Sequence, residues 1–356
     1  MMALLQGDLR VLLLAQVVLI GFPFLLYLCS GNSTGTEERV LLDHDGGTDD
    51  FIALMVLMNY HVLGLISLEG IAVTPADCYI LPALGATQKV LRLYGQSQIE
   101  VSRGVLHGQN SFPDEWRARA FPVDALPLLN MDEAPLPPLT PEPGHEFLRR
   151  KLQEAEEPLT VVVTGPLTNL GEVLTTNPEL SAQIRRVVWM GGAFEVRGNV
   201  KDFQHDGSAE WNAYWDPRGA RRVFAATGVP LVAFPCDVTD NVPVTRALLQ
   251  QLSAPARVAC PLAHLVGQMY ALTTQSFPSY ADQPVYYMWD TLTALSLGLG
   301  DRVAYATKRA EVLLGEPSAG RTRVVPEGEP GGREVTVAVG VEPEEAYAAL
   351  LRLFDE

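Results

Sequence analysis

Short apolar runs alternate with amphipathic stretches along most of the chain. The runs at 40–42 and 159–163 are brief and bounded by polar residues, which is typical of strands buried in a sheet. Residues 51–59 and 77–94 have the apolar spacing expected of helices. The alternation continues in strand-like runs at 65–73, 186–190, 231–234 and 334–341, and in helical patterns after Pro166 and at 343–354. This rhythm predicts an α/β fold with a mainly parallel sheet covered by helices.

Two segments depart from the rhythm. Residues 104–144 are rich in proline and polar side chains and show little periodicity, so we expect a long surface loop there. Residues 11–29 run 19 positions without a charge. We therefore expect one domain at 38–356, preceded by a hydrophobic leader and a short linker at 1–37.

The leader has three readings. Its length is close to the roughly 20 residues of a membrane-spanning helix and exceeds the roughly 7–15 of a signal-peptide core. A signal anchor is therefore favoured, followed by a cleaved signal peptide and then by a buried or mis-started extension. Asn32 begins an N-glycosylation pattern just beyond the leader. These features predict a membrane-anchored protein or one in the secretory pathway, and a cytoplasmic protein if the leader has no function.

Composition narrows the range of partners. Hydrophobic residues make up 47% of the 356 positions, enough to bury a core. The chain has 26 basic and 42 acidic residues, which gives a net charge of −16 and argues against nucleic acid as a partner. The four cysteines are too widely spaced to form a disulfide framework or a paired-cysteine zinc site. Cations, neutral small molecules and proteins remain.

The most informative stretch is an acidic cluster between a predicted strand and a predicted helix. Four carboxylates fall within eight residues there: Asp43, Asp45, Asp49 and Asp50. Like charges this close repel one another and raise their pKa values, and a hard divalent cation such as Ca²⁺ or Mg²⁺ would offset the repulsion. Gly46 and Gly47 permit a tight turn that brings Asp45 towards Asp50. The cluster therefore predicts a cation site.

Three other interpretations apply to this segment. A solvated acidic turn is the simplest, although such turns seldom follow a central strand. An EF-hand loop starting at Asp43 fails, because its sixth position is Thr48 instead of glycine and its twelfth is Leu54 instead of glutamate. An aspartyl phosphatase of the haloacid dehalogenase type also begins with a strand followed by Asp-x-Asp-Gly. It needs a downstream lysine and a later acidic pair, and the sequence offers no convincing set.

The acidic segment LLDHDGGTDDF resembles the Asp-x-Asp-x-Gly-x-Asp-Asp signature of calcium-dependent nucleoside hydrolases, and is most similar to their purine-specific (inosine-adenosine-guanosine) branch. Further similar blocks follow in order at 73–79, 112–117, 161–170, 187–200, 207–217 and 286–294. The resemblance implies an open, mixed, mostly parallel sheet flanked by helices. It also implies an N-glycosidase that hydrolyses purine ribonucleosides to ribose and free base.

Carried over residue by residue, the resemblance implies that Ca²⁺ is bound by the carboxylates of Asp45, Asp50 and Asp290 and by the backbone carbonyl of Thr164. In the family the ion also holds the ribose 2′- and 3′-hydroxyls and a water, from which Asp45 would take a proton. The sequence supports this for Asp290, which lies in an apolar helical stretch at 288–297 where an unpaired carboxylate would be costly. The alternative role for Asp290 is a helix N-cap.

The same resemblance implies the substrate contacts. The positions that match ribose-binding residues, with one beside the pocket, are Asp49, Asn199, Glu210, Asn212 and Met190. Asp43 would orient the cluster from behind. Asp77 matches a residue that contacts the base, and Trp116 and Trp289 match an aromatic pair that stacks on the purine. Pyrimidine-accepting relatives carry a histidine at the position of Trp289. Each tryptophan could otherwise be an ordinary core or surface aromatic.

Two features depart from the family pattern. Gln275 stands where a histidine is expected, and residues 276–284 contain no arginine, so closure of the loop at 275–285 is in question. The apolar leader is the second departure. Both motivate an alternative function as a non-catalytic nucleoside-binding protein or a membrane-tethered protein on the same scaffold. The resemblance leaves room for a homo-oligomer and does not set which purine is preferred.

Overall fold

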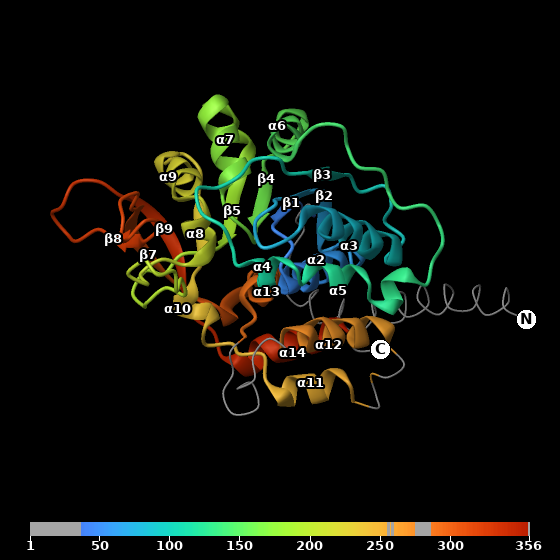
Figure 1. Ribbon diagram of the computed structural model, residues 1–356. Coiled ribbons are helices and arrows are strands. Elements are labelled where there is room, and N and C mark those ends of the chain that lie inside the picture. The colour runs from blue at the N-terminus through green and yellow to red at the C-terminus, as the bar shows by residue number, and fades with distance from the viewer. Residues whose placement is uncertain (1–36, 255–256, 258–259, 275–285, 355–356) are drawn as a thin grey trace, which may run out of the picture.

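The computed structural model describes residues 37–254, 257, 260–274 and 286–354, and these residues form one sheet with helices on both faces (Figure 1). The strands are β1 (Glu38–His44), β2 (Ile66–Val73), β3 (Val101–Arg103), β4 (Leu159–Val163), β5 (Ile184–Met190), β6 (Leu231–Phe234), β7 (Ala304–Val312), β8 (Thr322–Val324) and β9 (Arg333–Gly340). Among the described residues they form a nine-stranded sheet in the order β3-β2-β1-β4-β5-β6-β9-β7-β8. The acidic turn follows β1, the third strand in that order, between β2 and β4.

The sheet is mixed and mostly parallel. Every neighbouring pair from β3 through to β9 is parallel, whereas β7 pairs antiparallel with both β9 and β8. The expected fold class, an open, mostly parallel α/β sheet in a single domain, is confirmed. Because the chain returns through helical crossovers, the carboxyl ends of the parallel strands all lie at one edge of the sheet.

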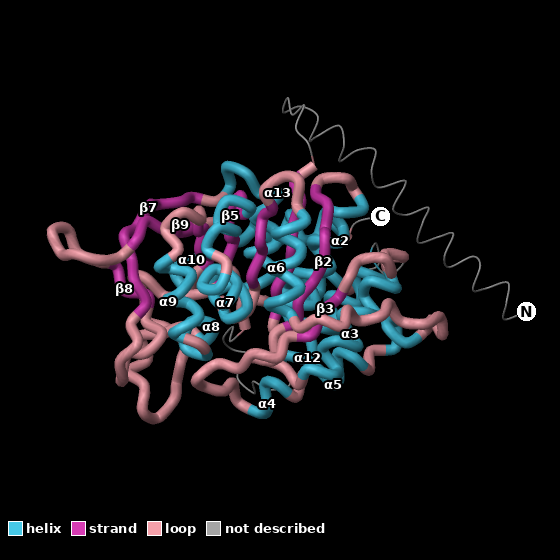
Figure 2. Tube along the Cα trace, turned by 90° about the horizontal axis from the view of Figure 1, so that it is seen from above, coloured by secondary structure: helices cyan, strands magenta, loops and turns pink. Residues whose placement is uncertain are grey.

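Helices cover the sheet in two layers. Their bounds are α2 (Thr48–Val62), α3 (Ile80–Leu93), α4 (Asp114–Arg117), α5 (Ala120–Asp124), α6 (Gly144–Glu154), α7 (Thr168–Thr176), α8 (Trp211–Trp215), α9 (Pro217–Ala225), α10 (Cys236–Thr239), α11 (Arg246–Leu252), α12 (Pro261–Thr274), α13 (Trp289–Leu299) and α14 (Pro343–Leu353). Helices α6, α7 and α9 lie over one face and are nearest the viewer in Figure 2. Helices α2, α3, α12, α13 and α14 cover the other face.

Successive residues of the central strands point into opposite layers. In β1, Val40 and Leu42 join the core beneath α2, whereas Leu41 joins the core beneath α6 and α7. In β4, Val162 faces the first core and Val161 the second. This period of two is what a strand buried on both faces requires, and it explains why these strands read as continuous apolar runs.

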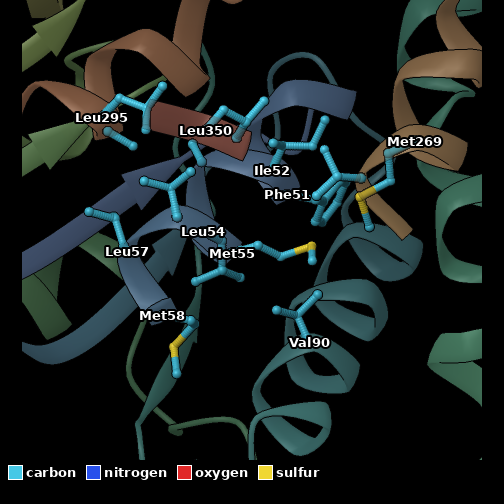
Figure 3. Packing of buried hydrophobic residues seen from close by; sticks show 14 of the residues in the cluster. Phe51, Ile52, Leu54, Met55, Leu57, Met58, Val90, Met269, Leu295 and Leu350 are labelled. Carbon is cyan, nitrogen blue, oxygen red and sulfur yellow. The ribbon is translucent and has the colours of Figure 1, made fainter. Parts of the chain in front are cut away.

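Helix α2 is buried on all sides. Its residues from Thr48 to Tyr60 are all buried, and it packs against α3, α12, α13 and α14. Figure 3 shows Phe51 and Met55 of α2 among Val90 of α3 and Met269 of α12. A helix that is apolar all round can form only inside the protein, so packing fixes the position of its N-terminus, where the acidic turn lies.

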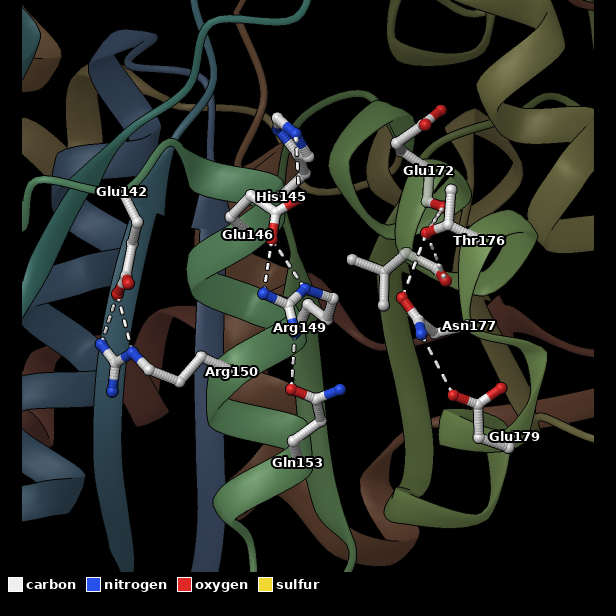
Figure 4. A network of polar contacts seen from close by, with 11 residues as sticks. Glu142, His145, Glu146, Arg149, Arg150, Gln153, Glu172, Thr176, Asn177 and Glu179 are labelled. Atoms are coloured by element: carbon white, nitrogen blue, oxygen red, sulfur yellow. Dashed lines mark hydrogen bonds and ion pairs between the residues drawn. The ribbon is translucent and has the colours of Figure 1, made fainter.

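The outer faces of α6 and α7 are polar (Figure 4). On the α6 side, Arg150 contacts Glu142 at 2.5 Å, and Arg149 donates hydrogen bonds of 2.6 Å to both Glu146 and Gln153. These side chains are part-buried or exposed, so each ion pair contributes at most about 1 kcal/mol. This polar network forms a solvent-facing surface, and we assign no catalytic or binding residue to it.

The expected long loop at 104–144 is partly wrong. It contains the short helices α4 and α5 and a 3-10 turn at Pro127–Asn130. Helices of four or five residues are too short to produce a readable apolar period, since one turn presents only one or two core positions.

The expected membrane-anchored or secretory location also needs correction. Within the described part of the chain, none of the helices is long and apolar enough to cross a bilayer. The apolar leader at 11–29, on which that prediction rested, lies outside the described residues.

Arg333 fixes the end of α9 from inside the protein. It is buried, and its guanidinium donates to the carbonyl oxygens of Val223 at 3.2 Å, Ala226 at 3.0 Å and Val229. Val223 lies in the last turn of α9 and the other two residues follow it, where backbone acceptors lack the full set of intrahelical partners. We expect Arg333→Leu to lower the free energy of unfolding by about 2–4 kcal/mol, because it leaves buried acceptors unpaired. Urea denaturation would measure this, and the exposed Arg218→Leu on the same helix is the control, with a change near zero.

Candidate active site

The acidic turn lies at the carboxyl end of β1, beside the ends of two neighbouring strands. Thr164 follows β4, and its amide donates a 3.0 Å hydrogen bond to the carbonyl oxygen of Asp43. Thr74 follows β2, and its amide donates a 2.7 Å hydrogen bond to the carbonyl oxygen of His44. Residues after three adjacent strands are thus joined at the edge where open parallel sheets bind ligands.

Two glycines allow the chain to approach Asp45 closely. Gly46 has a φ of 76°, and a Cβ atom there would lie 2.8 Å from the Cβ atoms of Cys78 and Ala83. A Cβ atom at Gly165 would lie 2.7 Å from that of Asp45. Side chains at either position would push the turn away from the strand ends, so glycine is required for the geometry of the acidic cluster.

Asp45 and Asp50 form one carboxylate pair, since burial and then the charge of Asp50 raise the pKa of Asp45. Asp50 also accepts hydrogen bonds from the hydroxyl of Thr164 at 2.6 Å and from the amide of Gly47 at 2.7 Å. Asp45 accepts a 3.2 Å hydrogen bond from the amide of Asp77. The pair is therefore oriented by the ends of β2 and β4 and by the first turn of α2.

Asp49 and Asp290 form a second carboxylate pair across 241 residues of sequence. The amide of Asp290 donates to Oδ2 of Asp49 at 3.1 Å, and the hydroxyl of Tyr286 donates to its Oδ1 at 2.5 Å. Asp290 lies inside the first turn of α13, whose N-cap is Met288, so the alternative role as an N-cap does not apply. Both oxygens of Asp49, an expected ribose ligand, accept from the protein itself.

The cluster is buried with little compensating positive charge. The five aspartates are at most 6% exposed: Asp43, Asp45, Asp49, Asp50 and Asp290. Burial raises the pKa of Asp43 and of Asp50 to about 7. Burial, and then the neighbouring carboxylates, raise the pKa of Asp45 and Asp290 well above the ordinary value. No basic side chain is among the main influences on any of these four groups.

The chemistry of these donors fits a hard divalent cation. All are oxygens, and buried carboxylates without a basic partner need either protons or a cation to neutralise them. Among the described residues, no three Asp, Glu, His or Cys side chains converge with metal-site geometry. Burial and the mutual repulsion of neighbouring carboxylates raise the pKa values of Asp45 and Asp290, and a bound cation would offset both costs.

A second wall of the site comes from α8. Glu210 is the N-cap of this helix, and its carboxylate accepts from the amides of Asn212 at 2.7 Å and Gly192 at 2.9 Å. Burial raises the pKa of Glu210 to about 7. The Asn212 amide group donates to the carbonyl oxygens of Thr164 at 3.0 Å and Met190 at 3.1 Å. Asn212, Met190 and Thr164 are therefore brought together. Asn199, also expected at the ribose, accepts from the amide of Trp211 at 3.0 Å.

Asp43 is held by two residues that the sequence interpretation missed. Its carboxylate accepts from the hydroxyl of Thr74 at 2.9 Å and from the side-chain amide of Asn169 at 3.2 Å. Asn169 also donates to the Thr74 hydroxyl at 2.9 Å. Both residues lie in the similar blocks, Thr74 directly after β2 and Asn169 in the first turn of α7, the helix that follows β4, and these locations could have indicated them. Asp43 thus links the end of β1 to the residue after β2 and to the start of α7, next to Asp45.

The two expected stacking tryptophans lie in separate aromatic groups. Trp116 packs at 5.4 Å against Trp211 and at 6.4 Å against Phe112. Trp289 packs edge-on against Tyr286 at 4.8 Å. Within the described residues no ring contact joins Trp116 to Trp289, and such a contact is not expected if a base lies between them. The loop at 275–285 lies outside the described residues.

Asp77, the expected base contact, is half-buried. Burial raises the pKa of its carboxyl group well above the ordinary value, against the opposing effect of Arg119. Its Oδ1 atom is buried without a hydrogen-bond partner among the described residues. An unpaired acceptor beside Asp45 is consistent with a contact to a ligand.

The sequence and the fold match a known family. The sequence model described as inosine-uridine preferring nucleoside hydrolase matches residues 40–348. The chain belongs to this nucleoside hydrolase family. A solved inosine-uridine preferring nucleoside hydrolase from Bacillus anthracis is 35% identical, with a TM-score of 0.81 over 89% of this chain and 99% of that one.

Other relatives of this nucleoside hydrolase differ in their described substrates. A pyrimidine-specific ribonucleoside hydrolase RihA from Shewanella sp. (strain ANA-3) is 30% identical, over 65% of this chain and 69% of the relative. A probable uridine nucleosidase 2 from Arabidopsis thaliana is 30% identical over 59% of this chain, and the match spans only 63% of that relative. Family membership therefore does not assign the purine preference expected from the sequence.

Proposed function

We propose that the chain hydrolyses the N-glycosidic bond of ribonucleosides to ribose and free base, with a preference for purines. The observation that carries the proposal is the buried cluster of Asp45 and Asp50 after β1 and Asp290 in α13, for which the described residues show no basic side chain among the main influences. A protein retains such a costly arrangement where a bound cation uses it.

We propose Ca²⁺ as the cofactor, held by Asp45, Asp50, Asp290 and the carbonyl oxygen of Thr164. When bound, it supplies positive charge that fixes the sugar hydroxyls and lowers the pKa of water. Asp45 accepts the proton of the attacking water, whose oxygen bonds to the anomeric carbon. The bond to the base nitrogen breaks, its electron pair leaves with the base, and the base takes up a proton. The surrounding carboxylates favour the positive charge of an oxocarbenium-like transition state.

The α8 wall is proposed to hold the ribose. Glu210 and Asn212 are buried next to Met190 and Thr164, and their backbone and side-chain hydrogen bonds keep them in place before a substrate arrives. Asn199 completes this wall in our proposal. Asp49 already accepts hydrogen bonds from Tyr286 and Asp290, so we expect it to support Asp290 as well as to accept from a sugar hydroxyl.

Trp289 supports the purine preference. It directly precedes Asp290, where the resemblance implies a histidine in pyrimidine-accepting relatives. In our proposal Trp116, from the other aromatic group, stacks on the second face of the base. Aromatic surfaces on both faces favour a large ring and ease its protonation as it departs, and Asp77 supplies a polar contact.

A nucleoside panel tests the proposal. Purified protein with Ca²⁺ should release ribose from inosine and guanosine, with kcat/KM at least about tenfold above that for uridine. Faster cleavage of uridine, as the names of the RihA relatives would favour, would contradict the purine preference alone. Binding of inosine without any product would identify a non-catalytic binding protein instead, and phosphate release from a phosphoester would favour the aspartyl phosphatase.

A further inference from the structure

Asp240 contacts the indole of Trp289 from another part of the fold. It lies directly after α10, and its Oδ1 atom accepts a 2.9 Å hydrogen bond from Nε1 of Trp289, 49 residues away. The carboxylate is part-buried, which raises its pKa, while the bond from Trp289 favours its charged form. Asp240 is absent from the residues assigned above to the cation, the sugar or the base.

The backbone on either side fixes this contact. The amide of Met288 donates to the carbonyl oxygen of Val242 at 2.9 Å, and the amide of Val244 donates to that of Tyr286 at 2.8 Å. Pro243 and Tyr287 form an antiparallel bridge between them. The segment that carries Asp240 and the segment that carries Trp289 are thus tied together two residues from the contact itself.

The rings around Trp289 restrict the indole further. Tyr286 packs edge-on at a centroid distance of 4.8 Å, and Tyr287 packs at 5.5 Å. A hydrogen bond at the Nε1 end and rings beside it leave the indole plane little rotational freedom. A carboxylate that accepts from Nε1 also increases the electron density of the ring, which strengthens its attraction for a base that gains positive charge on protonation.

We propose that Asp240 is a positioning residue that sets base selectivity by holding the indole plane of Trp289. The inference rests on the proposed function, in which Trp289 stacks on a purine. Asp240 acts through Trp289 and touches neither the sugar nor the cation. It is predicted to matter for purines, which need the stacked surface, and much less for uridine, whose smaller ring uses less of it.

The test compares Asp240→Ala with Asp240→Asn. We expect Asp240→Ala to lower kcat/KM for inosine about 10–100-fold and that for uridine less than about threefold. A displacement of the stacking indole ring by about 1 Å is enough to lower the rate by this factor. Asp240→Asn retains an oxygen acceptor and should recover most of the inosine activity. Asp301 is exposed, and Asp301→Asn removes one negative charge beyond the other end of α13 from Trp289. This control should leave kcat/KM for both inosine and uridine unchanged. Equal losses on inosine and uridine, or no loss on either, would overturn the inference.

A double-mutant cycle separates positioning from a general structural effect. Trp289→Phe keeps an aromatic ring but lacks Nε1, so adding Asp240→Ala to it should cost little more for inosine. Additive losses would mean that Asp240 does not act through Trp289. The indole ¹⁵N–¹H resonance of Trp289, assigned by its loss in Trp289→Phe, should shift in Asp240→Ala and return towards its original position in Asp240→Asn.

Calorimetry distinguishes failure of the inference from failure of the proposed function. If the unaltered protein releases no ribose from any nucleoside, the proposed activity is wrong, and inosine binding then tests Asp240. Inosine should bind at least about fivefold more weakly to Asp240→Ala than to the unaltered protein. Equal affinities, or no inosine binding by either protein, would overturn the role of Asp240.

Discussion

Asp45→Asn is expected to lower kcat for inosine hydrolysis by about 10³- to 10⁵-fold, the range for loss of a catalytic base with a second function. In the proposed mechanism Asp45 both accepts the proton of water and binds the cation. Asparagine fills the same space, but its amide neither takes up that proton nor neutralises a cation. The measurement is single-turnover ribose release at saturating Ca²⁺, which separates the chemical step from binding.

The fold of Asp45→Asn should survive. Asp45 is buried beside Asp50, and loss of one of two like charges removes repulsion, so the metal-free variant should unfold at or above the temperature of the unaltered protein. Asp301→Asn serves as the control for removal of one exposed carboxylate, with full activity expected. A kcat within a few fold of the unaltered value in a folded Asp45→Asn would remove Asp45 from the role of base.

Removal of divalent metal is expected to abolish activity and to make stability fall as pH rises. Asp43 and Asp50 have pKa values of about 7 in the fold, against ordinary values of 3.8, so the folded chain holds protons that the unfolded chain releases. Their stabilising contribution is complete below pH 3.8 and is lost as pH rises through about 7. Between pH 5.5 and 8, the metal-free protein should therefore become less stable.

Ca²⁺ should reverse that loss. A cation that binds only the folded state adds about 2.7 kcal/mol at 100 times its Kd, which corresponds to a rise of several degrees in Tm. Thermal unfolding at pH 5.5 and pH 8, after chelation and after addition of Ca²⁺, measures both effects. Mg²⁺ at the same concentration tests whether the site needs the larger ion. Equal Tm values with and without Ca²⁺ at pH 8 would contradict a structural cation at these carboxylates.

The central strands and the buried helix could be predicted from sequence because their apolar runs are uninterrupted. β1, β4 and α2 lie where the pattern places them. The short helices α4 and α5 could not be predicted, because each is only about one turn long and shows no apolar period. The antiparallel β7 was also missed, since its residues are mostly part-exposed and lack a continuous apolar run.

The residues of the candidate site also differ in whether a local sequence pattern could predict them. The acidic turn is local, and its four aspartates could be identified from spacing alone. The contact of Tyr286 with Asp49 spans 237 residues and that of Asp240 with Trp289 spans 49, so no local pattern contains either. Thr74 directly follows β2 and Asn169 lies in the first turn of the helix after β4, so the sequence pattern could have indicated both. Asp240 can be identified only from the tertiary structure.

The enclosure of α2 has a consequence for engineering this protein. Its interior residues support the fold while its first turn supplies Asp49 and Asp50, so a library along this helix would mostly return variants that have lost both properties at once. Diversity aimed at new nucleobases is better placed at Trp116 and at Tyr287 and Asp240, whose side chains are partly solvent-accessible. Substitutions at these positions can change nucleobase recognition without disturbing the packing of α2.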